Sequence, residues 1–166
     1  ASGVLYTLDP QHGYGETMKL SATWGLGSPV VSGQVIGDQF SIERQPPHHV
    51  KAMQLVRKET ALQSLSTGGT RLKPVTTNLQ TQACLHNDQL KKIAATGILI
   101  EKYFKRPQDI EFAVNKDGEL IILQSRPLRI KPSQAPKAPE LGQLLSHYPV
   151  LFRDKGEIAQ EGVATG

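Results

Sequence analysis

The stretch "QDIEFAVNKDGELIILQSRP", Gln108 to Pro127, decides the fold prediction for this chain. It consists of two runs of β-branched, aromatic and aliphatic residues on either side of Asp117 and Gly118. Asp-Gly is typical of a two-residue β-hairpin turn, because a type I′ turn needs positive φ at both central positions. The stretch therefore predicts two antiparallel strands joined by a tight turn.

A two-residue turn fixes the register of a hairpin and so the face on which each side chain lies. Counting outward from Lys116 opposite Glu119 predicts an apolar face toward the core and a second, polar face. The predicted core-facing pairs are Val114 with Ile121, Phe112 with Leu123, and Ile110 with Ser125. The predicted pairs on the other face are Ala113 with Ile122, Glu111 with Gln124, and Asp109 with Arg126.

The last two pairs form a two-by-two polar cluster at the open end of the hairpin. Carboxylate and amide oxygens from Asp109, Glu111 and Gln124 are hard ligands, suited to a Mg²⁺ ion that also holds phosphate oxygens. Arg126 beside them is suited to neutralising a transferring phosphoryl group. The alternative is a surface salt bridge between Asp109 and Arg126, with Glu111 solvated.

The rest of the chain predicts an α+β fold, an antiparallel sheet with one covering helix. Period-two alternation predicts an antiparallel meander; its strands are expected at residues 4–8, 18–23, 38–44 and 50–58. Helical spacing predicts a helix over residues 88–104, with Asn87 or Asp88 as its N-cap. Gly97 in its middle indicates close packing. The pattern is weak over residues 59–82, where "STGGTRLKPVTTN" at 66–78 is interpreted as a loop that can contain a short strand.

Composition excludes several classes of protein. The chain has 166 residues, a net charge of +4, one cysteine and few aromatic residues. No dense basic stripe points to nucleic acid, and no apolar run approaches the roughly 20 residues that span a bilayer. The start has no basic, apolar signal sequence. A single cysteine, Cys84, rules out a disulfide within the chain and fits a cytoplasmic protein.

A proline-rich segment predicts a domain boundary. The stretch "PLRIKPSQAPKAPELG" contains four prolines with Lys, Ser and Gln, which is typical of a semi-rigid extended linker. We expect a first domain at residues 1–126, a linker at 127–142 and the truncated start of another domain at 143–166. Because both ends look cut, the chain is expected to be a fragment of a longer protein.

Several motifs resemble one enzyme family. "DIEFAV…DGELIILQSRP", "SGVLYTLDP", "WGLGSPVVSGQV" and "IEKYFKRPQDIEF" are similar to ordered signatures of the nucleotide-binding domain of phosphoenolpyruvate synthase and pyruvate phosphate dikinase. The resemblance covers residues 1 to about 130 and matches only loosely between residues 45 and 86. It implies the C-terminal part of an ATP-grasp domain.

The resemblance also implies an activity and roles for residues. In this family the domain transfers a phosphoryl group from ATP to a histidine on a swivelling domain, and the group then passes to pyruvate. Glu111 and Gln124 match the Mg²⁺ ligands, Arg126 matches an arginine that contacts the ATP phosphates, and Asp109 matches a further acidic residue. "QEGVATG" resembles the first strand of the phosphohistidine domain. Pro127 favours the synthase or the related rifampicin phosphotransferase over the dikinase. The synthase is the expected parent, with pyruvate phosphate dikinase and rifampicin phosphotransferase as alternatives.

The chain departs from the family pattern at several points. Ser28 stands where the family usually has Glu, which puts the role of that position in doubt. The family's other phosphate-binding lysine and arginine, and its adenine hinge, belong to an earlier subdomain, and its histidine would lie beyond Gly166. We therefore expect no turnover and weak ATP binding from this chain by itself. The sequence leaves the acceptor and a homodimeric parent open.

Other motifs have simpler interpretations. "STGGT" at 66–70 lacks the Gly-Lys-Ser/Thr of a Walker loop and reads as a flexible turn. His48 and His49 read as a solvated loop, and Lys19 and Lys51 as lysines on strand surfaces. A rival of another class is a non-catalytic interaction module. It predicts that Asp109 pairs with Arg126 and that Mg²⁺ has no effect, whereas the enzyme hypothesis predicts oxygens of Glu111 and Gln124 converging on one point.

Overall fold

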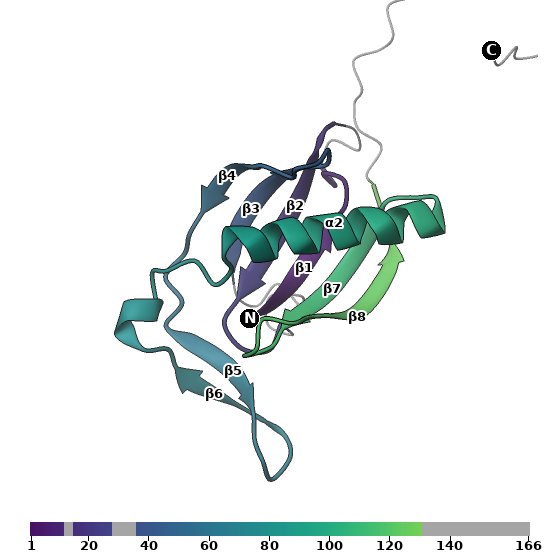
Figure 1. The fold of residues 1–166 in the computed structure, drawn as a ribbon. Coiled ribbons are helices and arrows are strands. Elements are labelled where there is room, and N and C mark those ends of the chain that lie inside the picture. Colours follow the sequence, from purple (N-terminus) through teal and green to yellow (C-terminus); the bar gives the residue numbers. More distant parts are fainter. Residues whose placement is uncertain (12–14, 28–35, 131–166) are drawn as a thin grey trace, which may run out of the picture. The chain divides into compact units, whose positions relative to one another are not determined.

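The computed structural model of the chain describes residues 1–11, 15–27 and 36–130 (Figure 1). The chain divides into two units, Ala1–Ser133 and Gln134–Gly166, and all described residues belong to the first. Most of the predicted linker, the predicted segment at 143–166 and Ser28 lie outside the described residues. The elements follow in the order β1 (Ser2–Tyr6), β2 (Thr17–Thr23), β3 (Asp38–Glu43), β4 (Val50–Gln54), β5 (Thr60–Ser64), β6 (Thr70–Pro74), the 3-10 helix η1 (Thr77–Leu79), α2 (Asn87–Phe104), β7 (Gln108–Val114) and β8 (Leu120–Pro127).

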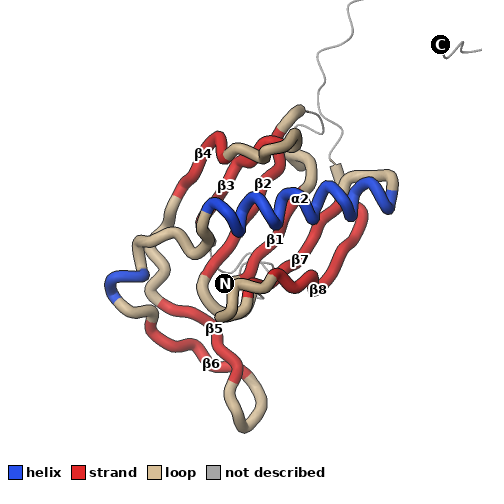
Figure 2. Tube along the Cα trace, viewed as in Figure 1, coloured by secondary structure: helices blue, strands red, loops and turns tan. Residues whose placement is uncertain are grey.

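Six strands form one antiparallel sheet in the order β4-β3-β2-β1-β7-β8. The predicted meander of the first four strands is confirmed. The chain then leaves the sheet, forms α2 and returns to place β7 on the free side of β1. Figure 2 shows α2 crossing one face of this sheet. The α+β class with a mostly antiparallel sheet and one long helix is therefore confirmed.

The core lies between the sheet and α2. Residues of β2, β3 and β7 alternate between buried and more exposed positions, as expected for strands with one face on the core. The core residues contributed by the strands are Leu5, Met18, Leu20, Ala22, Phe40, Ile42, Ile110, Phe112 and Val114. The helix and the segment before it add Cys84, Leu85, Leu90, Ile93 and Ala94. Burying each large aliphatic or aromatic side chain stabilises the fold by about 1.5–3 kcal/mol.

Helix α2 begins one residue earlier than predicted and ends where predicted. His86, rather than Asn87 or Asp88, is the N-cap, and its backbone N–H donates to the side-chain oxygen of Gln89 at 2.9 Å. The helix ends at Phe104, and Lys105, the C-cap that follows it, has a left-handed φ of 55°. The predicted close packing at Gly97 is confirmed, because a Cβ there would lie 2.4 Å from Cδ2 of Leu5.

The segment predicted as a loop contains a second, two-stranded sheet. Strands β5 and β6 pair antiparallel; β6 is a short strand of the kind that the sequence left open within residues 66–78, whereas β5 was not predicted. Strand β6 is exposed along its whole length, so no alternation of apolar residues marks it in the sequence. The hairpin is joined to the "WGLG" corner by a bridge between Gly25 and Leu62, in which the Leu26 N–H donates to the Leu62 carbonyl at 2.8 Å. Gly25 has a φ of 78° there.

Strand β4 is shorter than the predicted strand over residues 50–58. It ends at Gln54, because the chain then turns toward a buried carboxylate on β3. The Val56 N–H donates to Oδ1 of Asp38 at 3.0 Å, and Nζ of Lys58 lies 2.6 Å from the same oxygen. The Asp38 side chain thus accepts a backbone hydrogen bond that a neighbouring strand would otherwise have accepted if β4 had continued.

Candidate functional site

Polar side chains gather on the face of the six-stranded sheet that points away from α2. The strand registers arrange them in two ranks across all six strands. The first rank consists of Ala52, Ser41, Lys19, Tyr6, Asp109 and Arg126, from β4 to β8. The second rank consists of Gln54, Gln39, Ser21, Val4, Glu111 and Gln124. The four residues of the predicted cluster therefore lie together at one end of these ranks.

The register of the β7–β8 hairpin is confirmed at its open end and wrong near its turn. The pairs that hold as predicted are Ile110 with Ser125, Glu111 with Gln124, and Asp109 with Arg126. Nearer the turn the pairs are Phe112 with Ile122, Ala113 with Ile121, and Val114 with Leu120. The core-facing role predicted for Ile121 and Leu123 is also wrong, since they are 45% and 59% exposed.

The turn explains both results. Asn115, not Lys116, is opposite Glu119: the Asn115 N–H donates to the Glu119 carbonyl at 3.1 Å, and Gly118 has a φ of 80°. The turn thus has three residues, with glycine in the left-handed position, which shifts the inner register by one residue. Leu123 is the extra residue of a β-bulge, which restores the predicted register beyond it.

Asp109 and Arg126 form an ion pair in the first rank. Nε of Arg126 donates to Oδ2 of Asp109 at 2.9 Å, and the two side chains are 52% and 13% exposed. Among the described residues nothing hydrogen-bonds to the buried Oδ1 of Asp109. The hydrogen bond to Asp109 raises the pKa of Arg126. This pairing is the feature expected of an interaction module, and the second carboxylate oxygen is buried without a hydrogen-bond partner among the described residues.

Tyr6 separates the ion pair from the rest of the first rank. It lies between Asp109 on β7 and Lys19 on β2. Burial raises the pKa of the Tyr6 phenol, and the negative charge of Asp109 raises it further. The phenol is therefore a neutral hydrogen-bond donor at ordinary pH, beside a carboxylate.

Glu111 and Gln124 lie directly opposite each other in the second rank. Glu111 is half-buried and Gln124 is exposed. Their carboxylate and amide oxygens suit Mg²⁺, which binds one or two protein carboxylates and takes its other ligands from phosphate and water. In the described part of the chain, no three His, Cys, Asp or Glu side chains are grouped to hold a metal ion by themselves. The donor set thus fits a Mg²⁺ ion that arrives with a nucleotide.

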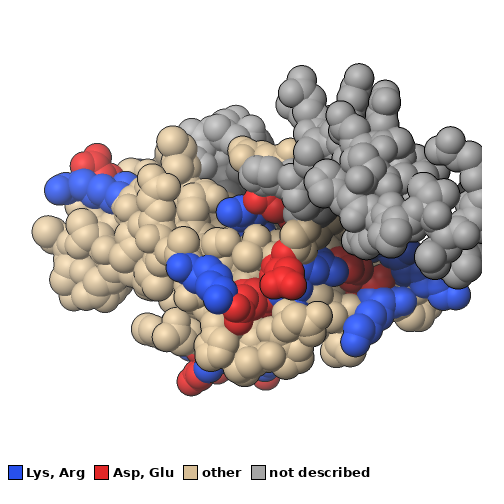
Figure 3. All heavy atoms as spheres, turned by 90° about the horizontal axis from the view of Figure 1, so that it is seen from above, with Lys and Arg blue, Asp and Glu red and all other residues tan. Residues whose placement is uncertain are grey.

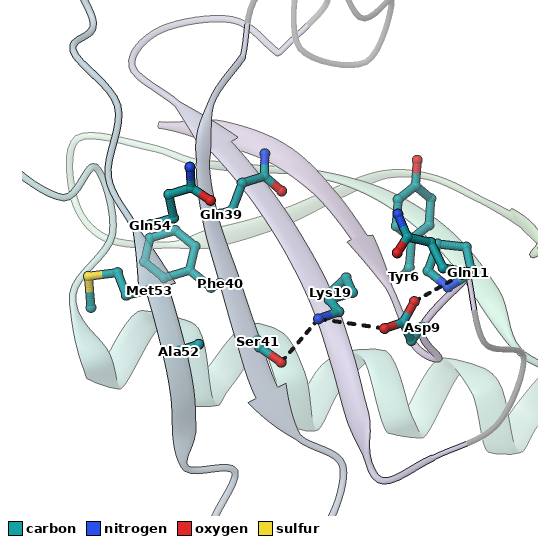
Figure 4. Close-up of a pocket in the computed structure, with 11 residues that line it drawn as sticks. Tyr6, Asp9, Gln11, Lys19, Gln39, Phe40, Ser41, Ala52, Met53 and Gln54 are labelled. Carbon is teal, nitrogen blue, oxygen red and sulfur yellow. Dashed lines mark hydrogen bonds and ion pairs between the residues drawn. The ribbon is translucent and has the colours of Figure 1, made fainter.

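Two hollows lie along the first rank. One pocket has a volume of about 480 Å³. It is lined by Tyr6, Pro10, Asp109 and the four consecutive residues Arg126, Pro127, Leu128 and Arg129. A second pocket of about 430 Å³ is lined by Tyr6, Pro10, Lys19 and residues of β3 and β4 (Figure 4). Tyr6 and Pro10 line both, so the two pockets adjoin at Tyr6.

Lys19 is a site residue to which sequence reasoning gave no role. Its Nζ lies 3.5 Å from Oδ2 of Asp9 and 3.5 Å from Oγ of Ser41, and Figure 4 shows it reaching toward both. Alternation within β2 indicates that Lys19 faces away from the core. Only the pairing of β1 between β2 and β7 brings it into the same rank as Asp109. Lys51 instead pairs with Glu43 at 2.5 Å on the surface.

The remaining candidates are structural. The "STGGT" segment is the turn of the β5–β6 hairpin, as predicted, with the Leu65 N–H donating to the Gly69 carbonyl at 3.0 Å. The prediction of a solvated loop is wrong for His48, which is buried and has Nδ1 3.0 Å from the Glu43 carbonyl. Cys84 is buried in the core, and burial raises the pKa of its thiol.

Charged side chains are interleaved over the surface. On the face shown in Figure 3, acidic and basic groups of the described residues lie next to one another rather than in a block of one sign. Within the described ranges, α2 and η1 fall short of the length and apolar character needed to cross a bilayer.

Comparison with known proteins gives one family and a consistent set of relatives. The family described as "Pyruvate phosphate dikinase, AMP/ATP-binding domain" matches residues 1–143. A rifampicin phosphotransferase of Streptomyces is 38% identical over 128 residues, which is 77% of this chain and 14% of the relative. A probable phosphoenolpyruvate synthase of Methanocaldococcus jannaschii is 31% identical over 167 residues, 99% of this chain and 14% of the relative. A phosphoenolpyruvate synthase of Deinococcus radiodurans is 31% identical over 170 residues, 99% of this chain and 21% of the relative.

The chain thus spans between one seventh and about a fifth of the length of these curated relatives. The family match covers β1 to β8, and so both ranks of the site. The resemblance inferred from the motifs is confirmed by this match. The chain belongs to the pyruvate phosphate dikinase AMP/ATP-binding domain family.

Proposed function

We propose that this chain is the Mg²⁺- and phosphate-binding half of an ATP-grasp-like domain in a phosphoenolpyruvate synthase. The parent enzyme would transfer a phosphoryl group from ATP to a histidine of a separate phosphohistidine domain, and from there to pyruvate. The observation that carries the proposal is the pairing of Glu111 with Gln124 and Asp109 with Arg126, side by side on the polar face of a sheet from this family.

The roles follow from the chemistry of each side chain. Glu111 and Gln124 would hold Mg²⁺, which when bound neutralises charge on the nucleotide phosphates. Arg126 would bind the phosphoryl group, since a guanidinium matches phosphate oxygens in a bidentate manner. Asp109 would orient Arg126 through the 2.9 Å hydrogen bond, and its carboxylate would support the metal shell or position a water. Phosphoryl transfer depends almost entirely on such positioning and electrostatic stabilisation.

The extent of the sequence matches supports the synthase as the parent. Synthase relatives align over 99% of this chain, whereas the rifampicin phosphotransferases align over 77%. The phosphotransferase is the second candidate, because its identity reaches 38%. A segment at 127–142 would then be the linker to the phosphohistidine domain, and the parent enzyme would act in the cytoplasm.

The test is to remove one predicted Mg²⁺ ligand in the full-length protein. Glu111→Gln keeps the shape of the side chain and removes its charge. We expect pyruvate- and ATP-dependent formation of phosphoenolpyruvate to fall by about 100-fold or more, in line with the loss of one transition-state contact. The Mg²⁺ concentration that gives half-maximal rate should rise in the same variant, and Gln124→Ala should behave likewise.

Asp117→Asn is the matched control, because it removes a carboxylate from the exposed turn of the same hairpin. Unchanged activity and Mg²⁺ dependence in both Glu111→Gln and Gln124→Ala would refute the proposal and favour the interaction module. Phosphorylation of rifampicin in place of pyruvate would instead identify the second candidate.

A further inference from the structure

Two guanidinium groups line the 480 Å³ pocket beside Tyr6, although the predicted cluster contains only one. Among the described residues of its lining, Arg126 and Arg129 are cationic and Asp109 is the single carboxylate. Arg129 lies two residues beyond the end of β8, outside the ladder from which the cluster was predicted. The described lining of the pocket is therefore more positive than the four-residue cluster, which has two carboxylates and one guanidinium.

The lining carries an excess of one positive charge. Arg126 is neutralised by Asp109 at 2.9 Å, whereas Arg129 has no ion-pair partner among the described residues. A concave site with an uncompensated guanidinium attracts an anion and binds phosphate oxygens through a planar pair of N–H groups.

The backbone holds Arg129 near this pocket. The Leu128 N–H donates to the Pro107 carbonyl at 2.9 Å, which ties the chain after β8 to the residue just before β7. Pro127, with its fixed φ, precedes this hydrogen bond. The backbone of Arg129 thus follows directly after an anchored position, on the side of the hairpin where the pocket lies.

We infer that Arg129 is a second phosphate-binding residue, which holds the phosphate chain of the nucleotide together with Arg126. The inference rests on the proposed function, because it assigns a further contact to the same site. Its ligand chemistry is a polyphosphate whose oxygens bridge the two guanidinium groups. Asp109 would fix the position of Arg126, and Arg129 would supply a charge that no carboxylate of the described residues cancels.

The experiment uses the full-length protein and calorimetric titration with sodium tripolyphosphate and with MgATP. Arg129→Gln should weaken binding of both by about 10-fold or more, the effect of losing hydrogen bonds to a charged group. Arg129→Lys should fall in between, because lysine keeps the charge and loses the planar pair of donors. The matched control is Arg71→Gln, which removes an arginine from the exposed strand β6 and should change binding by less than about twofold.

The outcomes separate the inference from the proposed function. Binding by Arg129→Gln that equals binding by Arg71→Gln would overturn the inference. If Arg129→Gln binds like the control but Arg126→Gln loses MgATP affinity, the proposed function stands and only the role of Arg129 is overturned. If Arg126→Gln, Glu111→Gln and Arg129→Gln all bind MgATP like the unaltered protein, both are overturned. Arg129 is exposed, so equal thermal unfolding midpoints are expected and serve as the folding control.

Discussion

Two lysine–carboxylate ion pairs lie at opposite ends of β3. They differ strongly in burial but hardly in the distance between nitrogen and oxygen. Nζ of Lys58 lies 2.6 Å from Oδ1 of Asp38, and the side chains are 1% and 0% exposed. Nζ of Lys51 lies 2.5 Å from Oε1 of Glu43, and those side chains are 58% and 25% exposed. Neutralising the carboxylate of each pair, with Asp38→Asn and Glu43→Gln, therefore compares a buried carboxylate and its hydrogen bonds with an exposed one.

The buried substitution should be costly. Asp38→Asn leaves the Lys58 ammonium in the core without a counter-charge, and breaking a buried pair in this way destabilises a protein by about 3–5 kcal/mol. The carboxylate also accepts the backbone N–H groups of Val56 and Cys84, both at 3.0 Å. With a urea m-value of about 1–3 kcal/mol per M, the unfolding midpoint should fall by about 2 M. Glu43→Gln breaks a pair screened by water, so its midpoint should stay within experimental error.

The assay is urea unfolding of the chain followed by fluorescence of Trp24, its single tryptophan. The indole N–H donates to the Leu79 carbonyl at 3.0 Å, so its emission reports loss of the packed state. Adding Lys58→Met to Asp38→Asn should recover much of the lost stability, because the unpaired charge is removed. Equal midpoints for Asp38→Asn and Glu43→Gln, or no recovery in the double variant, would refute the reasoning.

Two further predictions concern α2 and Tyr6. Gly97→Ala should lower the free energy of unfolding by about 1–2 kcal/mol despite the better helix propensity of alanine, because the new Cβ would lie 2.4 Å from Cδ2 of the fully buried Leu5. Adding Leu5→Val should give a loss smaller than the sum of the two single losses; strict additivity would contradict the packing argument. The Tyr6 phenol should titrate above its ordinary pKa of 10.0, so stability from this group is present below pH 10 and is lost as the pH rises through the folded pKa. Absorbance titration against a Tyr6→Phe variant measures this, and Asp109→Asn should lower the pKa while Asp117→Asn leaves it unchanged.

The sequence by itself determined the elements whose patterns are local. Alternation within residues 17–23, 38–43 and 108–114 gave strands with one core face, and helical spacing gave α2 to within one residue at its start. It also identified Gly97 as a point of close packing. These features depend on neighbours along the chain, so each strand or helix carries its own signal.

The strand pairing at the open end of the hairpin was predicted correctly, although the turn from which it was counted was predicted incorrectly. The count assumed a two-residue turn, whereas the turn has three residues and Leu123 forms a bulge that cancels the shift. The length of the turn and the position of the bulge depend on how β8 packs against β7. The sequence alone does not distinguish a three-residue turn with a bulge from a two-residue type I′ turn without one.

Only the tertiary structure decided which polar residues share a site. Lys19, Tyr6 and Asp109 are far apart in the chain, and they stand in one rank because β1 pairs with β2 on one side and with β7 on the other. The buried pair between Asp38 and Lys58 and the exposed β5–β6 hairpin arise in the same way, from contacts between distant segments. Side-chain alternation fixes the face on which a residue lies, but its neighbours across the sheet depend on strand order. Strand order is set by the packing of the whole sheet against α2.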